Sequence, residues 1–300
     1  MPKVPLRVGI WFNSLHVSYG GPSLVLIGTI LGILQQDDPF IILLNEVGDV
    51  NWCVDRTNTL RYDLAKAPNM YIGPLVFSSA DAEIEDYTQH ELWKYGSNFL
   101  APSHWFRWWI MQGLPFDKKE KAGHRTCDIW GSGVDIDYFR PIGEKKHDYF
   151  IYFKSQNFPN LQKVHQFLFN NYFHFRGTVL TYYHYDKEML REQANNSRFC
   201  IMVDNTETQG LASLEIMACN CPLFVLDCTQ HKGDRMAMNG ATSVPCMDHR
   251  CGMKSSWETM EKDFPLFLKA LSLFQPRAYV CESYSFKAAA KNLLQIMANR

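Results

Sequence analysis

The chain has 300 residues, of which 46% are hydrophobic and 20% are charged, and its formal net charge is −1 at pH 7. These values are typical of a globular protein with two ordinary domains or one large domain. The near-neutral charge argues against a general nucleic-acid binder, which would carry a basic excess. No run of about 20 apolar residues is present, so we expect no membrane span.

The cysteines indicate a reducing compartment. The sequence has nine of them, an odd number, scattered without any C-x-x-C pair. Cys219 and Cys221, taken with His231, fit no common zinc spacing, so no metal site is expected. The N-terminus has no cleavage site of small residues, so we expect no signal peptide. Together these features predict a cytoplasmic protein with free thiols.

The N-terminal part of the chain predicts the start of a Rossmann-like domain. A strand over 7–13 is followed by a turn that contains Gly20 and Gly21, and then by an apolar helix over 23–35. The turn matches neither G-x-G-x-x-G nor a Walker loop, which argues against dehydrogenases and kinases. The two glycines form either a plain tight turn or a contact to a ligand. Further strands are expected over 40–44, 71–77 and 98–101, whereas 49–69 fits no element.

The C-terminal half predicts a second α/β domain. A strand over 149–153 places Lys154 at its carboxyl end, and the loop after a later strand contains Tyr182, which either stacks on a nucleotide base or is an exposed aromatic residue. The hexapeptide 247–252 (MDHRCG) fits no mechanism and is interpreted as structural. We expect these further elements: strands over 173–180 and 240–247, and helices over 161–170, 186–195, 260–274 and 285–297.

The stretch 198–227 (RFCIMVDNTETQGLASLEIMACNCPLFVLD) predicts a strand, a loop, a helix and a second strand. Such a βαβ unit belongs in a parallel sheet. Ligands of α/β sheets bind beyond the carboxyl ends of the strands, which is where this loop lies. The stretch is therefore the first place to look for a binding site.

Two carboxylates of this unit are candidate ligand-binding groups. Glu207 lies in the loop, and Glu215 falls within the apolar stripe of the helix, where a carboxylate needs hydrogen-bonding partners. The backbone amides of Gln209, Gly210 and Leu211 begin the helix and favour an anion such as a phosphate. One alternative stays open: Glu207 is a solvated loop residue, and Glu215 is paired with an arginine or a backbone amide of the protein.

The same stretch resembles the donor-site signature of family-4 retaining glycosyltransferases, roughly E-G-F-G-L-x-x-L-E-A-M-A-x-G-x-P-V. The positions that match in register are Glu207, Gly210, Leu211, Leu214, Glu215, Met217, Ala218 and Pro222. The departures are Thr208, Gln209, Ile216 and Asn220. In that family the first glutamate contacts the transferred sugar and the second contacts the ribose of the nucleotide, so the resemblance implies these roles for Glu207 and Glu215.

A second segment, 126–141 (TCDIWGSGVDIDYFRP), resembles the family's segment that leads from the N-terminal domain into the linker. The resemblance further implies that Lys154 neutralises the donor diphosphate, in the place of the family's Gly-Arg pair. It also implies that Gly20 and Gly21 face the donor phosphate or the acceptor. An arginine fork would bind the diphosphate bidentately, and a lysine keeps the charge without that geometry.

The resemblance implies an α/β, GT-B-like fold: two Rossmann-type domains whose parallel sheets face each other across a cleft. We expect an abbreviated acceptor-side domain over 1–141, a nucleotide-sugar-binding domain over 148–282, and a closing helix over 283–300 that returns toward the first domain. The expected partners are a nucleotide-sugar donor and a glycan or other hydroxyl acceptor, as in polysaccharide biosynthesis, with no nucleic acid and no membrane span.

The activity that follows is retaining transfer of a hexosyl or pentosyl group, catalysed by Glu207 and Lys154 without a metal or other cofactor. Two alternatives remain at this point. One is a nucleotide-sugar epimerase of the same fold, and the other is a non-catalytic nucleotide- or glycan-binding protein, which the missing Gly-Arg pair favours.

Overall fold

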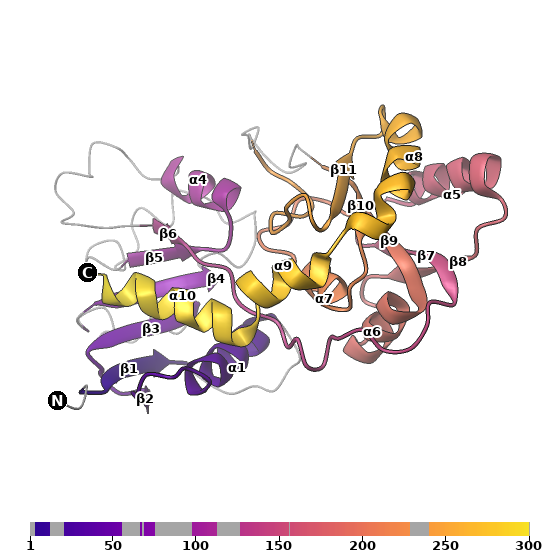
Figure 1. Cartoon of the computed structure of the whole chain (residues 1–300). Coiled ribbons are helices and arrows are strands. Elements are labelled where there is room, and N and C mark those ends of the chain that lie inside the picture. Colours follow the sequence, from indigo (N-terminus) through magenta and orange to yellow (C-terminus); the bar gives the residue numbers. More distant parts are fainter. Residues whose placement is uncertain are drawn as a thin grey trace. The chain divides into compact units, whose positions relative to one another are not determined.

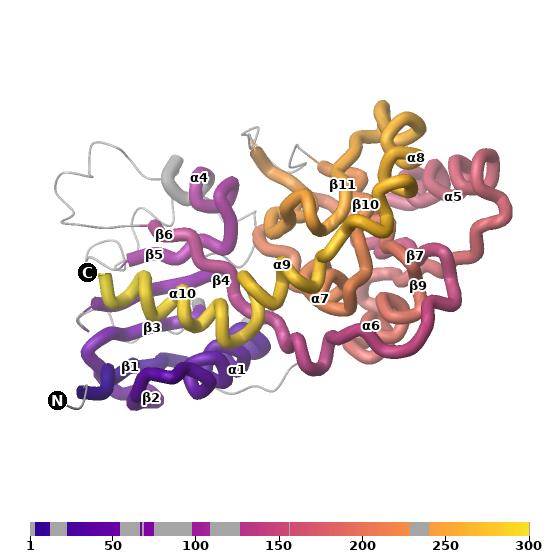
Figure 2. The backbone as a smooth tube through the Cα atoms, viewed as in Figure 1, coloured from indigo at the N-terminus to yellow at the C-terminus, as the bar shows by residue number. Residues whose placement is uncertain are grey.

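The computed structural model describes residues 4–12, 21–55, 67, 69–75, 98–112, 127–155, 157–228 and 240–299. The chain divides into two compact units (Figures 1 and 2). The first comprises Met1–Gly133, Gly233–Arg235 and Tyr284–Arg300, and the second comprises Val134–Lys232 and Met236–Ser283. Each unit has its own sheet, in which all of the strand pairs are parallel.

The first unit is built on a six-stranded sheet with the order β2-β1-β3-β4-β5-β6. Val8 of β1 lies opposite Ile42 of β2 and Val50 of β3, so the apolar runs of the three strands are in register. The described elements of this unit are β1 (Leu6–Trp11), α1 (Gly21–Leu34), β2 (Phe40–Leu44), β3 (Val50–Asp55), β4 (Met70–Leu75), β5 (Asn98–Ala101), α4 (His104–Gln112), β6 (Cys127–Ile129) and α10 (Phe286–Ala298).

Strand β3 was not expected, because its six residues begin a stretch in which no element was predicted. The strand is nevertheless central, with Trp52 completely buried. The indole of Trp52 donates a hydrogen bond to the carbonyl of Gly73 at 2.8 Å and packs edge-to-face on Trp130, with 5.7 Å between the ring centroids. The polar residues on both sides of this short apolar segment conceal it in the sequence.

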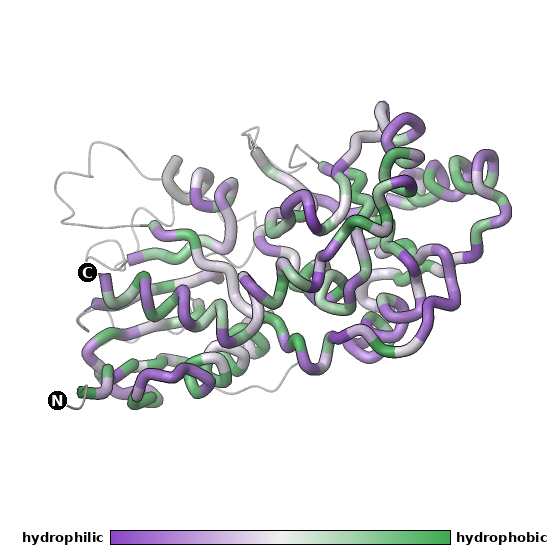
Figure 3. The backbone as a smooth tube through the Cα atoms, in the orientation of Figure 1, coloured by the Kyte–Doolittle hydropathy of each residue, from purple (hydrophilic) through white to green (hydrophobic). Residues whose placement is uncertain are grey.

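The last helix, α10, packs against α1 within the first unit. Its hydrophobic and hydrophilic residues alternate along the tube (Figure 3), and Ala290 and Leu293 are fully buried. Gly32 permits the close approach, since a Cβ at that position would lie 2.1 Å from the carbonyl oxygen of Phe286. Ser285 caps the helix by accepting a hydrogen bond from the amide of Ala288 at 3.2 Å.

The second unit is built on a five-stranded sheet with the order β11-β10-β9-β7-β8. Helices cover both of its faces, with α6 against β7–β9 and α8 against β10 and β11. Its elements are β7 (His147–Phe153), α5 (Phe158–Tyr172), β8 (Gly177–Thr181), α6 (Lys187–Asn196), β9 (Ser197–Val203), α7 (Leu211–Ala218), β10 (Leu223–Leu226), β11 (Gly252–Ser255), α8 (Met260–Ala270), the 3₁₀ turn η4 (Leu271–Leu273) and α9 (Pro276–Ser283).

An aromatic cluster fills the space between this sheet and the helices α5 and α8. Phe264 of α8 is completely buried at its centre. Its ring lies 4.9 Å from that of Phe224, 5.4 Å from that of Phe167 and 5.8 Å from that of Phe199, measured between centroids. Edge-to-face rings of this kind add to the gain from burial alone.

The prediction of a last strand over 240–247 was wrong. The edge strand beside β10 is β11, and 240–247 forms a turn and bends. The hydrogen-bonding groups of this segment are used elsewhere: the amide of Ser243 donates to the Asp227 carboxylate at 2.8 Å, and the carbonyl of Thr242 accepts from the amide of Glu207 at 3.0 Å. They are therefore not available for a sheet ladder.

The hexapeptide 247–252 has a structural role. Asp248 accepts a hydrogen bond from the amide of Arg250 at 2.8 Å and pairs with its guanidinium at 2.9 Å. The same guanidinium reaches Glu282 of α9 at 2.7 Å. Gly252 then enters β11 with φ +142°, where a Cβ would lie 1.9 Å from the carbonyl oxygen of Leu223. The turn thus ties β11 to α9.

All nine cysteines are free. Among the residues that the structure describes, no helix combines the length and apolar character that crossing a bilayer requires.

We expect Phe264→Ala to lower the free energy of unfolding by about 3–5 kcal/mol, because it removes a ring from the centre of the aromatic cluster and leaves a cavity. Urea unfolding followed by fluorescence measures the change. Phe173→Ala is the matched control, since 79% of that side chain is exposed. Equal losses in the two variants would show that the cluster does not hold the second unit together.

Candidate functional site

The site begins where three neighbouring strands of the second unit end. Strands β8, β7 and β9 are adjacent and parallel, and the residues that follow them are Tyr182, Lys154 and Asp204. The amide of Lys154 donates to the carbonyl of Val203 at 3.1 Å, and the amide of Tyr182 donates to that of Phe153 at 2.9 Å. The backbone ladder therefore brings the three side chains to one edge of the sheet.

Lys154 lies at the centre of this group. Its ammonium pairs with the carboxylate of Glu207 and stands 4.8 Å from the centroid of the Tyr182 ring. Burial lowers the pKa of Lys154, and the negative charge of Asp204 partly offsets that effect. Three residues singled out in the sequence, Lys154, Tyr182 and Glu207, are thus brought together.

Asp204 was missed by the sequence analysis. Only 7% of the residue is exposed, and burial raises its pKa to about 6, although nearby Lys154 acts in the opposite direction. A signal for it was present, because Asp204 directly follows the apolar run 199–203 and therefore stands at the carboxyl end of a buried strand. Ligands of α/β sheets bind at this edge, so an acidic residue there is a candidate site residue.

The loop from Asp204 leads to the first turn of α7. Gly210 precedes the helix with φ +76° and ψ +67°, a left-handed conformation that favours glycine. Its carbonyl accepts a hydrogen bond from the hydroxyl of Ser213 at 2.7 Å. Gln209 before it is buried, and Leu211 after it is the first helical residue. The three residues expected to offer amides to a phosphate lie at the tip of α7.

Glu215 is almost completely buried in α7 and has a cationic partner. The ammonium of Lys187 donates to its two carboxylate oxygens at 2.5 and 2.6 Å. Burial raises the pKa of Glu215, and the charge of Lys187 lowers it in part. The alternative left open by the sequence was that Glu215 is paired within the protein. It is so paired, although its partner is a lysine and not an arginine or a backbone amide. Binding of a ribose by Glu215 stays a prediction.

Lys187 was also missed, because nothing in the sequence links it to a residue 28 positions later. It is the first residue of α6, directly after Asp186, whose carboxylate accepts from the amide of Met189 at 2.8 Å and caps the helix. Helix α6 packs against α7, and this packing brings Lys187 to Glu215.

The remaining predicted positions belong to the first unit. Gly21 is the first residue of α1, and Gly20 lies outside the described residues. Their contact with a donor or an acceptor stays a prediction.

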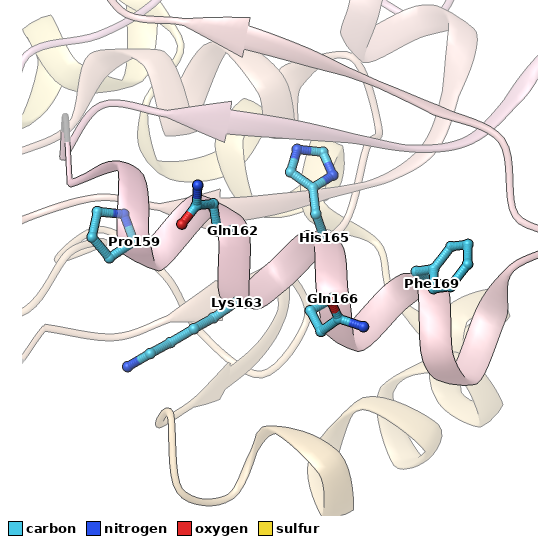
Figure 4. Close-up of a pocket in the computed structure, with 6 residues that line it drawn as sticks. All are labelled: Pro159, Gln162, Lys163, His165, Gln166 and Phe169. Atoms are coloured by element: carbon cyan, nitrogen blue, oxygen red, sulfur yellow. The ribbon is translucent and has the colours of Figure 1, made fainter.

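One pocket of the second unit lies away from the predicted site residues. It has a volume of about 750 Å³ and runs along α5, lined by Pro159, Gln162, Lys163, His165, Gln166 and Phe169 (Figure 4). All of these residues come from one helix, and none of the predicted site residues is among them.

Similar folds occur in known glycosyltransferase structures. The lipopolysaccharide outer core galactosyltransferase WaaB in its apo form is 12% identical, with a TM-score of 0.58 over 98% of this chain and 100% of that one. A TarM variant from S. aureus, in complex with fondaparinux, α-GlcNAc-glycerol and UDP, is 12% identical with a TM-score of 0.54, and this chain covers 59% of its length. The α,α-trehalose 6-phosphate synthase of Burkholderia multivorans is 11% identical with a TM-score of 0.52, covering 92% of this chain and 76% of that one.

No protein-family profile and no curated protein sequence matches the chain. The structural similarity, together with the two parallel sheets, shows the predicted two-domain α/β fold of the GT-B class.

We expect Lys187→Met to destabilise the protein by about 2–3 kcal/mol at pH 8, because it leaves the buried Glu215 carboxylate without its cation. The loss should be smaller near pH 4.5. The pKa of Glu215 is already raised and rises further without Lys187, so below it the folded protein holds a neutral acid and the penalty disappears.

Thermal unfolding across this pH range measures the effect. In the double variant Lys187→Met/Glu215→Gln neither side chain is charged, so the additional loss of stability at pH 8 should vanish. A destabilisation of Lys187→Met that is the same at both pH values would contradict this account.

Proposed function

We propose that the protein is a retaining glycosyltransferase, which moves a hexosyl or pentosyl group from a nucleotide-diphosphate sugar to a hydroxyl of a glycan. The observation that carries the proposal is that Lys154 and Tyr182, at the carboxyl ends of adjacent parallel strands, meet Glu207 of the loop that leads to the tip of α7. The likeness to the fold of WaaB, described as a galactosyltransferase, and of TarM, solved with UDP, supports this choice.

In this proposal the second unit binds the donor. The base stacks on Tyr182, the ribose binds Glu215, and the sugar binds Glu207. The diphosphate lies between Lys154 and the amides of Gln209–Leu211, which are the groups suited to an anion.

Donor binding requires an exchange of partners. Lys154 is paired with Glu207 and Lys187 with Glu215 in the structure. A diphosphate takes over the ammonium of Lys154 and releases Glu207 toward the sugar hydroxyls. The ribose hydroxyls likewise share Glu215 with Lys187, a third of whose side chain is exposed. In this proposal Glu207 and Glu215 therefore each have a hydrogen-bonding partner before and after donor binding.

The reaction breaks the bond between the anomeric carbon and the diphosphate oxygen and forms a bond from the acceptor oxygen to the same face of that carbon. The acceptor proton goes to the departing phosphate. Lys154 and the helix amides stabilise the negative charge that develops on the leaving group. These groups take the place of a metal ion in the proposal, so transfer is expected to proceed in the presence of EDTA.

The first unit is proposed to serve the acceptor, with Gly20 and Gly21 facing the donor phosphate or the acceptor. The proposed domain limits are 1–141 for the acceptor-side domain, 148–282 for the nucleotide-sugar-binding domain and 283–300 for the closing helix. We propose a cytoplasmic location, since the nine free thiols suit a reducing compartment. No observation favours an epimerase.

We expect Glu215→Ala to weaken binding of the nucleotide at least tenfold, because the ribose loses its acceptor, while Glu207→Ala mainly slows transfer with little effect on nucleotide binding. A thermal-shift screen against UDP-, GDP-, ADP- and dTDP-sugars first identifies the donor. Calorimetry with the matching nucleoside diphosphate and a turnover assay then separate the two effects.

Glu188→Ala is the matched control, because that glutamate is exposed on α6 and should leave both quantities unchanged. Both site variants matching the wild type would refute the proposed function. Donor binding without hydrolysis or transfer to any glycan would favour a non-catalytic binding protein.

We also expect affinity for the intact nucleotide-sugar to rise as the pH falls from 7.5 to 5.5. The pKa of Asp204 is raised to about 6, so acidification neutralises a carboxylate beside Lys154 and reduces repulsion of the diphosphate. The gain should be up to about tenfold, since one charge at short range is worth on the order of 1 kcal/mol.

The nucleotide-sugar is the suitable ligand, because its esterified diphosphate keeps the same charge across this range. Calorimetry at several pH values measures the effect. Asp204→Asn should bind with one affinity throughout, and a pH dependence that persists in this variant would assign the effect to another group.

A further inference from the structure

Asp227 directly follows β10, which is next to β9, the strand that Asp204 follows. Its side chain is 15% exposed, and one oxygen, Oδ1, accepts two hydrogen bonds. The donors are the hydroxyl of Thr242 at 2.7 Å and the amide of Ser243 at 2.8 Å. The ammonium of Lys254 donates to the same threonine hydroxyl at 2.5 Å and lies 3.8 Å from the other oxygen of Asp227.

Thr242 and Ser243 contact the loop that carries Glu207. The carbonyl of Thr242 accepts the hydrogen bond of the Glu207 amide at 3.0 Å. The hydroxyl of Ser243 accepts from the amide of Cys228 at 2.9 Å and donates to the carbonyl of Asp204 at 3.3 Å. Both ends of the segment 204–207 are thus attached to the same two residues, which Asp227 holds in turn.

We propose that Asp227 is a positioning residue: with Thr242 and Ser243 it forms a brace that fixes the backbone of Glu207 relative to the strand ends. Asp227 itself does not touch the donor. The proposal rests on the proposed function insofar as Glu207 contacts the sugar, while the brace itself is a property of the backbone that can be tested without any donor.

The brace matters because the partner exchange at Lys154 releases the side chain of Glu207. Once its carboxylate turns to the sugar, the ion pair no longer holds this residue, while the hydrogen bond from its backbone amide to the carbonyl of Thr242 still fixes its backbone. A misplacement of about 1 Å at a reacting centre can cost on the order of a hundredfold in rate. Loss of the brace should therefore reduce kcat more than it changes the KM for the donor.

The test compares four variants of the full chain. Asp227→Ala removes the acceptor, and Asp227→Asn retains an Oδ1 that accepts both hydrogen bonds. Thr242→Val deletes one hydroxyl at nearly constant shape and serves if Asp227→Ala does not fold. The matched control is Asp148→Ala: Asp148 also accepts a backbone amide, that of Arg176 at 3.0 Å, and pairs with Arg198 at 3.0 Å, but it lies at the beginning of β7.

Two readouts are used. Hydrogen exchange of the Glu207 amide should become at least tenfold faster in Asp227→Ala and Thr242→Val and stay at the wild-type rate in Asp227→Asn and Asp148→Ala. In the transfer assay, kcat should fall about 10- to 100-fold in Asp227→Ala with the donor KM within about threefold, and Asp227→Asn should recover it.

Unchanged exchange at Glu207 in both Asp227→Ala and Thr242→Val overturns the brace, whatever the activity. Faster exchange with an unchanged kcat overturns the positioning role in the reaction. If the wild type transfers no sugar from any donor while exchange responds as expected, the proposed function fails and the brace stands.

Discussion

The end of the second sheet depends on one constraint: charged side chains that have been removed from water need compensation. Lys154 and Glu215 are both mainly buried. Desolvation lowers the pKa of Lys154 and raises the pKa of Glu215, which favours the neutral form of each side chain. The negative charge of Asp204 opposes that shift at Lys154, and the charge of Lys187 opposes it at Glu215. Ion pairs such as those with Glu207 and Lys187 rarely stabilise a fold more than apolar residues of the same volume would, so their presence in a small region calls for an explanation beyond folding. The proposed binding of a diphosphate and of several hydroxyl groups supplies one.

The side-chain charges of the site do not by themselves explain the proposed binding of a diphosphate. Lys154 faces two acids, Glu207 and Asp204, and Lys187 faces Glu215. The four carboxylate and ammonium groups of the two ion pairs sum to zero, and Asp204 adds a negative charge whenever it is ionised. A dianionic diphosphate would enter this region unfavourably if it met only the side chains. The tip of α7 changes the balance, because its amides and the helix dipole add positive potential at the place where the diphosphate is proposed to bind. The backbone of α7 is therefore as important for the proposed function as Lys154.

The sequence predicted those features whose signals are local. Strands β7 and β9 and helix α7 are apolar runs bounded by polar loops, and Gly210 marks the start of the helix, so their positions and that of Lys154 could be inferred. Contacts between distant residues could not. Lys187 meets Glu215 only because α6 packs on α7, and Asp204 gains its raised pKa only through burial beside neighbouring strands. Strand β3 was missed for a similar reason, since Trp52 is recognisable as a core residue only when Gly73 and Trp130 are placed around it.

The strand predicted over 240–247 does not form, and the hydrogen bonds made by Thr242 and Ser243 instead are those of the proposed brace. The residues from Gly240 to Met247 have enough apolar and β-branched character to favour a strand, and a strand would have continued the sheet beside β10. Instead the amide of Ser243 donates a hydrogen bond to Asp227, immediately after β10, and the carbonyl of Thr242 accepts one from the amide of Glu207. The strand beside β10 is β11, and the groups of 242–243 make contacts that fix the loop of Glu207. Natural sequences depart from their local preferences chiefly at functional or strained sites, and here the departure involves the backbone of the residue that is proposed to hold the sugar. The departure of 240–247 from its local strand preference therefore supports a functional role for the fixed loop of Glu207.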